Sequence, residues 1–426
     1  MRNYLYSLIF AFLLLACQTG GNDQQRVELE WVNLSHLNNL YEEVKINGEK
    51  MAIIHIYSEY PDYGWIDASN EGIACVDDVA RAAVVYLRHF EITGDSASLN
   101  HARNLLEFCR HMQAEDGLFY NFIYSDYSIN HEGKTSFKSL GWWAARGLWA
   151  LGEGYRVFLD QDADYAHLLE KQIKRIFPHI DTLLSHYPEV ESQSGFLRPQ
   201  WLLYNSAADA TSELMLGLAA YAEASHDTVA IRYLQEFGEG LVKMQISAGD
   251  DFPMGAHLSW RNAWHAWGNS QTQALARAGR LTKDVRFIES AELACTQFYP
   301  DWIEQGFPRE MTLAHDDTLS IDEIKQFDQI AYGMRPSIVG SLVLSEVTGD
   351  GRFAGLAAEL ATWFFGNNPA QTQMYDPQTG RCFDGILSET EINRNSGAES
   401  TIEALYAILE IEANPEAKKK LLRYLD

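Results

Sequence analysis

Carboxylates near both ends of the chain are the residues best suited to acid–base chemistry. Asp77 and Asp78 are consecutive, and Glu399 lies close to the other end of the chain. Inverting glycoside hydrolysis uses one carboxylate to activate water and a second, about 6.5–9.5 Å away, to protonate the leaving oxygen. We therefore expect Asp78, or its neighbour Asp77, to act as the base, and a C-terminal acid to act as the proton donor.

The local sequence pattern offers two residues for the role of C-terminal acid. Glu399 is expected in the first turn of a helix, where its side chain would face the mouth formed by the helix starts. The helix dipole also favours an acid at that position, so a purely structural role stays open. Asp384, within Arg381–Gly385, is a further candidate for catalysis or for substrate binding.

Other polar and aromatic residues recur at or just inside the starts of the predicted inner helices. Each has a structural explanation when taken alone: Asp78 could cap its helix, and Arg81 or Arg146 could pair with a neighbouring acid. The convergence of six helix starts at one mouth favours a functional role instead. We expect the following residues to bind substrate: Arg81, Trp142, Arg146, Asp209, Asn269, Arg335 and Asn395.

An aromatic segment between residues 252 and 267 belongs to the same mouth. It contains Trp264 and Trp267, whose flat faces suit the C–H surfaces of sugars. The histidines of this segment do not have the spacing of a metal site, and the chain has no phosphate-binding glycine loop. We therefore expect a carbohydrate ligand, no metal and no organic cofactor.

Six helical segments rich in small residues must position these side chains. Each carries apolar residues at helical periodicity, and a second helical pattern follows nearly every one. Such long repeats predict six helical hairpins within residues 26–426. The segments begin, at spacings of 63, 65, 62, 65 and 64 residues, near Asp78, Gly141, Ser206, Gly268, Gly333 and Gly397.

The connections predict how the hairpins are arranged. Short turns such as Thr93–Asp95 join the two helices of a hairpin, and consecutive hairpins alternate direction, so all the long loops fall at one end. An open solenoid of helix pairs normally has shorter repeats and brief connections. The sequence thus predicts an all-α fold, a closed (α/α) barrel of six hairpins. The long loops are expected at 114–140, 185–205, 247–267, 300–332 and 366–396.

The N-terminus and the overall charge predict where the protein acts. An apolar run from Tyr4 to Ala16 is too short to span a bilayer and matches a signal peptide, residues 1–16. Leu14–Cys17 is similar to the bacterial lipobox, which predicts a lipid on Cys17, a tether at residues 17–25 and a membrane-anchored lipoprotein, periplasmic or at the cell surface. The formal net charge of −26 disfavours nucleic acid or an anionic membrane as the main partner.

The six-hairpin layout resembles the α/α toroid of glycosidases, polysaccharide lyases and sugar epimerases. In addition, Trp363–Pro369 followed by Asn393–Ala398 is similar to the end of family 9 glycoside hydrolases, where a G-x-N-P stretch precedes an acidic residue and an N-A-G helix start. Matching Asn395 to that asparagine implies Glu389 as a catalytic acid, although its charged surroundings are also typical of a solvated loop. The chain departs from family 9 at Cys75–Asp78, where a D-A-G-D motif is absent, and it lacks that family's paired-histidine motif.

These observations favour an extracytoplasmic glycoside hydrolase that acts on an oligosaccharide or polysaccharide fragment. A polysaccharide lyase is one alternative, with Tyr332 or His257 as the base and Arg335 neutralising a uronate. A non-catalytic glycan-binding lipoprotein is the other. Because toroids host unrelated chemistries, the fold alone does not separate these functions.

Overall fold

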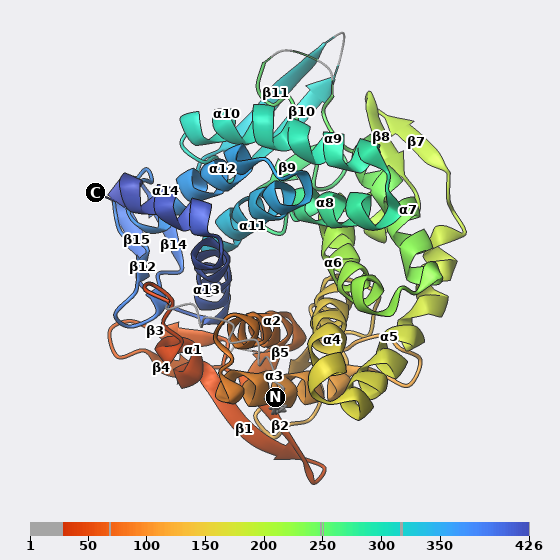
Figure 1. Ribbon diagram of the computed structural model, residues 1–426, viewed down its shortest axis with the longest axis vertical. Coiled ribbons are helices and arrows are strands. Elements are labelled where there is room, and N and C mark those ends of the chain that lie inside the picture. The colour runs from red at the N-terminus through yellow and green to blue at the C-terminus, as the bar shows by residue number, and fades with distance from the viewer. Residues whose placement is uncertain (1–28, 68–69, 248, 250, 316–317, 426) are drawn as a thin grey trace, which may run out of the picture.

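The computed structural model describes residues 29–67, 70–247, 249, 251–315 and 318–425. Within them, six inner helices surround one axis, and an outer helix follows each (Figure 1). The inner helices contact one another in chain order, and α13 contacts α2, so the ring is closed. The inner helices are α2 Val76–Thr93, α4 Trp142–Gln161, α6 Ala208–Ser225, α8 Gln271–Thr282, α11 Ala331–Thr348 and α13 Ala398–Ala413. The outer helices are α3 Ser96–Met112, α5 Ala163–Leu184, α7 Thr228–Lys243, α9 Val285–Leu293 continued by α10 Tyr299–Glu304, α12 Gly351–Ala361 and α14 Pro415–Leu425.

Capped short turns join the helices of a hairpin. Gly94 takes a left-handed backbone conformation (φ 71°) after α2, and the Asp95 carboxylate then accepts hydrogen bonds from two backbone N–H groups in the first turn of α3. Gly349 has the same conformation after α11, and Asp350 accepts from one N–H group of α12. Glycine adopts a positive φ without a steric penalty, and aspartate is a favoured N-cap. The predicted closed barrel of six hairpins is confirmed for the described residues, and each inner helix begins within one turn of its predicted position.

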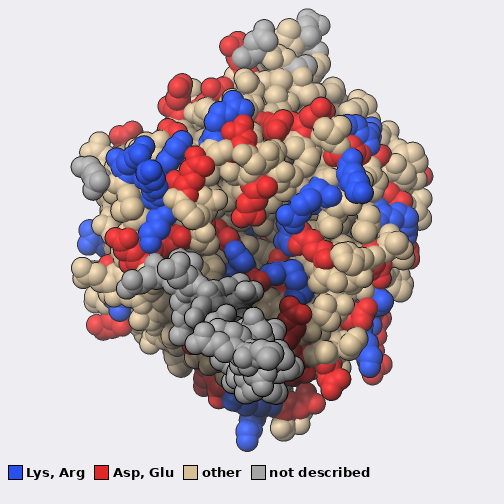
Figure 2. Space-filling model, viewed as in Figure 1, with Lys and Arg blue, Asp and Glu red and all other residues tan. Residues whose placement is uncertain are grey.

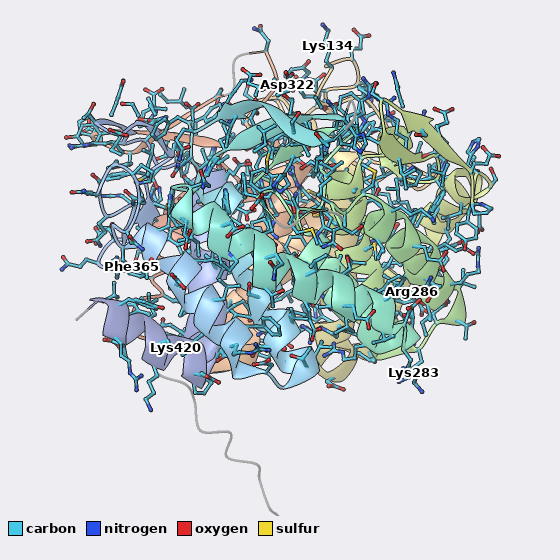
Figure 3. All side chains as sticks on the ribbon, turned by 90° about the horizontal axis from the view of Figure 1, so that it is seen from above. Lys134, Lys283, Arg286, Asp322, Phe365 and Lys420 are labelled. Carbon is cyan, nitrogen blue, oxygen red and sulfur yellow. The ribbon has the colours of Figure 1, made fainter. Side chains whose placement is uncertain are left out.

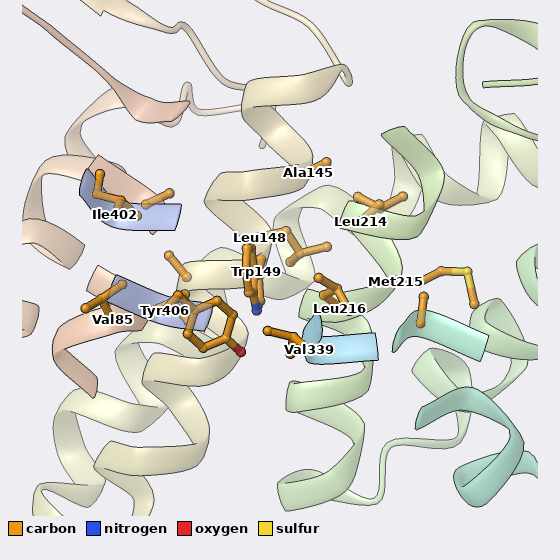
Figure 4. Packing of buried hydrophobic residues seen from close by; sticks show 14 of the residues in the cluster. Val85, Ala145, Leu148, Trp149, Leu214, Met215, Leu216, Val339, Ile402 and Tyr406 are labelled. Atoms are coloured by element: carbon orange, nitrogen blue, oxygen red, sulfur yellow. The ribbon is translucent and has the colours of Figure 1, made fainter. Parts of the chain in front are cut away.

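Small residues let the inner helices approach closely, and large residues fill the space that they enclose. A methyl group on Gly152 of α4 would lie 2.3 Å from the carbonyl oxygen of Gly217 in α6, so these two backbones are in direct contact. Trp149 and Tyr406 are buried with ring centres 5.7 Å apart. Figure 4 shows them close to Val339, where α4, α13 and α11 meet. Aromatic and aliphatic packing therefore fills this part of the barrel interior.

The long loops gather at the end of the barrel opposite to the short turns. Figure 3 shows Lys134 and Asp322 of the long loops at the top, and Lys283 and Arg286 of a short turn at the bottom. The loops and the segment before α2 carry short antiparallel strands: β3 Tyr57–Glu59 with β4 Gly64–Ile66, β5 Ala74–Cys75 with β6 Phe122–Ile123, β7 Val190–Gln193 with β8 Phe196–Pro199, the three-stranded sheet of β9 Ala263–His265, β10 Glu310–His315 and β11 Leu319–Lys325, β12 Tyr375–Asp376 with β13 Arg381–Cys382, and β14 Gly385–Ser388 with β15 Glu391–Asn393.

The segment before α2 packs against the outside of the ring. α1, Ser35–Leu40, contacts α13, and the hairpin of β1 Tyr41–Ile46 and β2 Glu49–Ile54 packs against α3. Further upstream, the Glu412 carboxylate near the end of α13 accepts hydrogen bonds from the N–H groups of residues 30–32. The first described residues are therefore held at the short-turn end of the barrel.

The predictions about membrane attachment concern the N-terminus of the chain. The predicted signal peptide at residues 1–16, the lipidation site Cys17 and the tether at residues 17–25 lie outside the described residues. Among the helices that the structure does describe, none has both the length and the apolar character of a membrane span.

Candidate active site

Two adjoining pockets open at the long-loop end of the barrel, with volumes of about 510 and 340 Å³. The larger, which we call the aromatic pocket, includes Trp142, Trp267 and Phe307 in its lining. The smaller, the charged pocket, is lined by residues that include Asp78 and Arg81. Six residues line both and so mark the junction of one continuous cleft: Asp77, Phe122, Arg146, Ile330, Tyr332 and Glu399.

Asp77 presents a firmly held carboxylate at this junction. It lies in the first turn of α2 and is partly exposed to solvent. Its Oδ1 accepts a hydrogen bond of 2.6 Å from Nη1 of Arg146 on α4. Its Oδ2 accepts one of 2.9 Å from the side-chain amide of Asn121, which lies just before β6. Two donors from different elements thus fix the orientation of the carboxylate, as catalysis by a general base requires.

Glu399 presents the second carboxylate at the junction. It lies in the first turn of α13, and its side chain keeps 44% of its surface exposed. Its Oε2 lies 3.3 Å from the guanidinium of Arg81. Although part of the side chain is exposed, desolvation by the surrounding protein raises the pKa of Glu399; Arg81 opposes this rise and Asp78 adds to it. The raised pKa favours the protonated form, which can donate a proton in the cleft.

Asp78 is the more buried member of the aspartate pair. Its carboxylate forms a 2.8 Å ion pair with Arg81 and accepts a hydrogen bond from Sγ of Cys75. Burial raises the pKa of Asp78, with a further contribution from Asp77, against the opposing effect of Arg81. Asp78 does not cap its helix, because α2 begins at Val76 and the capping position is Cys75. Both aspartates pair with an arginine, but Asp78 is the less exposed of the two and lines only the charged pocket.

A buried network of alternating charges lies beneath the cleft. Glu403 accepts a 2.7 Å hydrogen bond from Arg81 and one of 2.5 Å from Nε of Arg335. Arg335 in turn donates to Glu213 over 3.1 Å. Arg335 is fully buried and does not line either pocket, so the structure places it under the cleft rather than in its wall. It therefore supports the cleft and has no direct access to a substrate in this arrangement.

Tyr332 links this network to the cleft surface. Its hydroxyl group lies 2.6 Å from Nη2 of Arg146, which donates to it. The guanidinium groups of Arg81, Arg146 and Arg335 all lie within 5.4 Å of its ring centre. Burial raises the pKa of Tyr332, and this effect outweighs that of the three arginines. The hydroxyl therefore stays protonated at neutral pH.

Asp384 anchors the helix that carries Glu399. Its Oδ1 accepts hydrogen bonds from the N–H group of Gly397 over 2.8 Å and from Oγ of Ser400 over 2.6 Å. Burial raises its pKa, and these two hydrogen bonds oppose the rise. Asp384 also lines the charged pocket. Its position fits contact with a ligand as well as the orientation of the first turn of α13.

The structure brings only part of the predicted site set to the cleft. Those that line one or both pockets are Asp77, Asp78, Arg81, Trp142, Arg146, Trp267, Asp384 and Glu399. Those that line neither pocket are Asp209, Trp264, Asn269, Arg335, Glu389 and Asn395. Several of the second set have local partners instead: Asp209 pairs with His265 at 3.0 Å, and Asn269 donates to the carbonyl oxygen of His257.

The structure places three of these predicted residues away from both pockets. Glu389 lies exposed in the turn between β14 and β15, because the loop that contains it folds into a hairpin that points it into solvent. Trp264 is buried against Phe298 and Trp302 in the sheet of β9. Asn395 accepts a hydrogen bond from the N–H group of Tyr60 and so holds the β3–β4 turn.

The residues assigned to a lyase are not assembled at the cleft. His257 is buried beside Ser290, with which it shares a 2.9 Å hydrogen bond, and burial lowers its pKa to about 3. It lines neither pocket. Of that set, Tyr332 alone reaches the cleft, and its raised pKa opposes a role as base.

Two cleft residues have no signal in the sequence pattern. Tyr57 of β3 lines the charged pocket and keeps 45% of its surface exposed, although it precedes the first repeat. Arg309 lines the aromatic pocket, next to the start of β10, and its nearest acidic partner, Glu310, lies 3.5 Å away. Such residues can be found only from tertiary contacts or from related sequences, because their spacing does not follow the repeat. Among the described residues, no group of three or more His, Cys, Asp or Glu side chains is placed to hold a metal ion.

No protein-family model matches the chain, and no curated protein matches it by sequence. Solved structures do match it over most of its length. The cellobiose 2-epimerase from Bacillus thermoamylovorans has a TM-score of 0.58 at 13% identity, covering 90% of this chain and 96% of that chain. A D-mannose isomerase has a TM-score of 0.56 at 12% identity, covering 84% and 91%. An inactive variant of an α-1,6-mannanase from Salegentibacter sp., in complex with α-1,6-mannotriose, has a TM-score of 0.52 at 10% identity, covering 89% and 96%.

These likenesses establish the fold. The chain has the six-hairpin (α/α) toroid architecture that its repeats resemble, and this architecture extends over nearly all of each matched structure. At such low identity, the reaction must be argued from the site itself.

Proposed function

We propose that this chain is a carbohydrate-active enzyme that hydrolyses a glycosidic bond in an oligosaccharide or polysaccharide fragment. One observation carries the proposal: Asp77 and Glu399, from neighbouring inner helices, both line the junction of the two pockets. One is held as a hydrogen-bond acceptor, and the other has a raised pKa. A carboxylate paired with a protonated carboxylic acid is the arrangement that glycoside hydrolysis uses.

In this mechanism the glycosidic bond lies across the junction, with one sugar in each pocket. Glu399 donates its proton to the glycosidic oxygen as the bond from that oxygen to the anomeric carbon breaks. Asp77 accepts a proton from a water whose oxygen bonds to the same carbon. Asp77 then loses its proton and Glu399 regains one from solvent. Neighbouring helix axes lie about 8–10 Å apart, which leaves room for that water, and we therefore propose inversion.

The walls of the cleft support a sugar as the ligand. Trp142 and Trp267 line the aromatic pocket with their ring centres 5.8 Å apart. Arg146 and Asn121 line the same pocket, where both donate hydrogen bonds to the Asp77 carboxylate. The matched structures are of a cellobiose epimerase, a mannose isomerase and a mannanase bound to mannotriose, all of which are proteins that handle sugars. We propose the same broad class of substrate for this chain.

Hydrolysis is favoured over epimerisation or elimination by the groups that line the cleft. Both of those reactions begin with removal of a proton from carbon, for which histidine is the commonest base, and a carboxylate such as Asp77 is the other group in this cleft that could accept it. No histidine is among the described residues that line either pocket. The pKa of Tyr332 is raised, which keeps its hydroxyl group protonated.

We also propose where the protein is located in the cell. The lipobox-like Leu14–Cys17 supports removal of residues 1–16 and attachment of a lipid to Cys17. The protein would then act outside the cytoplasm, anchored to a membrane by this lipid. An enzyme so placed would meet glycan fragments before their uptake.

The proposal is tested by incubating the purified protein with a panel of neutral and acidic glycans. We expect new reducing ends, and we expect proton NMR to show a product whose anomeric configuration is inverted. An unsaturated product absorbing in the ultraviolet would establish a lyase instead. Saturable sugar binding without any product, unchanged in Asp77→Asn and Glu399→Gln, would establish a glycan-binding protein.

A further inference from the structure

One corner of the short-turn end differs in charge from the rest of this acidic molecule. The outer helix of the last hairpin, α14, has four basic residues and one acidic residue, whereas the whole chain has a formal net charge of −26. Figure 2 shows the short-turn end, with basic side chains gathered over α14 on the left of the view. Other basic side chains are scattered over the same face, but the excess of basic over acidic residues within α14 itself complements an anionic surface.

The exposed residues of this helix are both basic and apolar. We call Lys419, Leu422, Arg423, Tyr424 and Leu425 the α14 patch; all five are exposed. Ala417 and Leu421 of the same helix are buried against the body of the protein. Large apolar side chains interspersed with cations are typical of a surface that rests on the headgroups of a bilayer.

The N-terminal segment leaves the barrel beside the same helix. Lys418 of α14 lies 3.1 Å from Glu412, the carboxylate that holds residues 30–32, and 3.7 Å from Glu30. It also lies 5.6 Å from the ring centre of Trp31. The route from Cys17 to this point contains residues 18–28, which span at most about 40 Å. A lipid at Cys17 would therefore allow the α14 patch to reach the bilayer surface.

The cleft lies at the other end of the barrel. In Figure 3, Lys420 of α14 is low in the view, on the side of Lys283 and Arg286, whereas the long loops that form the cleft are at the top. The inner helices separate the two ends by about 27 Å, the length of an 18-residue helix such as α2. A molecule that rests on its α14 corner thus turns the cleft toward the solvent.

We propose that the α14 patch docks on anionic phospholipid and holds the domain with its cleft facing away from the membrane. The lipid at Cys17 alone restricts distance but not orientation. Attraction at the α14 corner supplies the orientation, and repulsion between the acidic body and the anionic lipid adds to it. The acidic residues near this helix include Glu30 and Glu412 beside Lys418, Glu416 at its start, and Glu359 of α12, whose charge acts on Tyr424.

This inference rests on the proposed anchor at Cys17, so its test supplies the anchor chemically. The mature chain from Cys17 onward is coupled through that thiol to a maleimide lipid in vesicles. The coupling is selective for Cys17 because the cysteines that the structure describes, Cys75, Cys109, Cys295 and Cys382, are all buried. The vesicles contain a phospholipid with a photoreactive group in its acyl chain. Mass spectrometry then locates the lipid adducts formed on illumination.

We expect adducts on residues 415–425 in vesicles that contain phosphatidylglycerol, and none on the β10–β11 hairpin at the cleft end. Reversing two exposed charges, by Lys419→Glu with Arg423→Glu, should lower the adduct yield at least about fivefold, since each basic residue contributes roughly that factor near an anionic surface. The matched charge reversal Lys283→Glu, at another exposed position of the same end, should leave the yield unchanged.

Adducts spread over both ends, or a yield at α14 that does not depend on phosphatidylglycerol or on the charge reversal, would overturn the inference. Failure of the cell to lipidate Cys17 is a separate outcome, seen by fractionation of cells, and it leaves this measurement intact. The two proposals therefore fail in distinguishable ways.

Discussion

Asp77 and Asp78 show how neighbouring residues of one helix can have different roles. Successive helical residues point about 100° apart, so only one of the two can face the middle of the cleft. Asp77 lies at the junction of the two pockets, held by Arg146 and Asn121. Asp78 is buried in an ion pair with Arg81. The carboxylate nearer to a substrate is therefore Asp77.

This difference predicts separate effects for the two amide variants. Asp77→Asn should lower turnover by about 100-fold or more and leave thermal unfolding nearly unchanged, because it removes a general base. Glu399→Gln should do the same by removing the general acid. Asp78→Asn should chiefly cost stability, up to about 3 kcal/mol, because it weakens a buried ion pair.

The measurements are kcat and thermal melting on the same purified variants. Full turnover in Asp77→Asn together with a large loss in Asp78→Asn would transfer the role of base to Asp78. Full turnover in Glu399→Gln would transfer the role of proton donor to Asp384 or Asp78, which also line the charged pocket.

The pH dependence of turnover should respond to Glu403, which does not reach the substrate. The negative charge of Glu403 helps to raise the pKa of Glu399, and it also pairs with Arg81. The general acid works while Glu399 is protonated, so activity falls as the pH rises through its pKa. Glu403→Gln should lower that pKa and so shift the alkaline limb of the kcat profile to lower pH.

A matched variant separates this effect from a loss of stability. Glu153 is also a buried carboxylate between two arginines, Arg156 and Arg277, but it lies near the short-turn end. Glu153→Gln should destabilise the protein in a similar way without moving the alkaline limb. Equal shifts in both variants would show that the pH profile reports unfolding rather than the protonation of Glu399.

At the scale of the elements, the close approach of α4 and α6 sets the width of the ring. Gly152→Ala should destabilise the protein by about 1–3 kcal/mol, because the new methyl group would meet the backbone of Gly217 at 2.3 Å. Gly154→Ala on the same helix is the control, since its methyl group would meet only the side-chain ends of Leu106 and Leu169. Both variants gain the same helix propensity.

Chemical denaturation of the two variants measures this difference. We expect a clearly lower midpoint for Gly152→Ala than for Gly154→Ala. Equal denaturation midpoints for the two variants would show that α4 and α6 can accommodate an added methyl group at their contact without a loss of stability.

At the scale of the whole molecule, the lipid anchor determines where the enzyme works. We expect Cys17→Ala to block lipidation and release the protein from the membrane fraction, because the lipid on Cys17 is the proposed anchor. The measurement is fractionation of cells followed by washing with high salt, which removes proteins held by charge alone. A variant that still partitions with membranes would contradict the lipoprotein proposal.

The sequence by itself determined the architecture of the molecule. Helical periodicity, small residues and turns such as Thr93–Asp95 are local signals, and they are repeated six times. Each repeat therefore confirms the others, and the predicted starts of the inner helices fall within one turn of those observed. The same reasoning placed Asp77 and Glu399 at one mouth, because closure of the ring follows from the number of repeats.

Only the tertiary structure decided which side chains share the cleft. Whether a residue near a helix start faces the axis or the packed interior depends on the rotation of that helix, which its neighbours set. This is why Arg335 lies buried beneath the cleft while Arg146 reaches its surface. The loops follow no repeat, so their side chains are placed by contacts between segments far apart in the chain. Such contacts leave Glu389 exposed and place Tyr57 in the lining of the charged pocket.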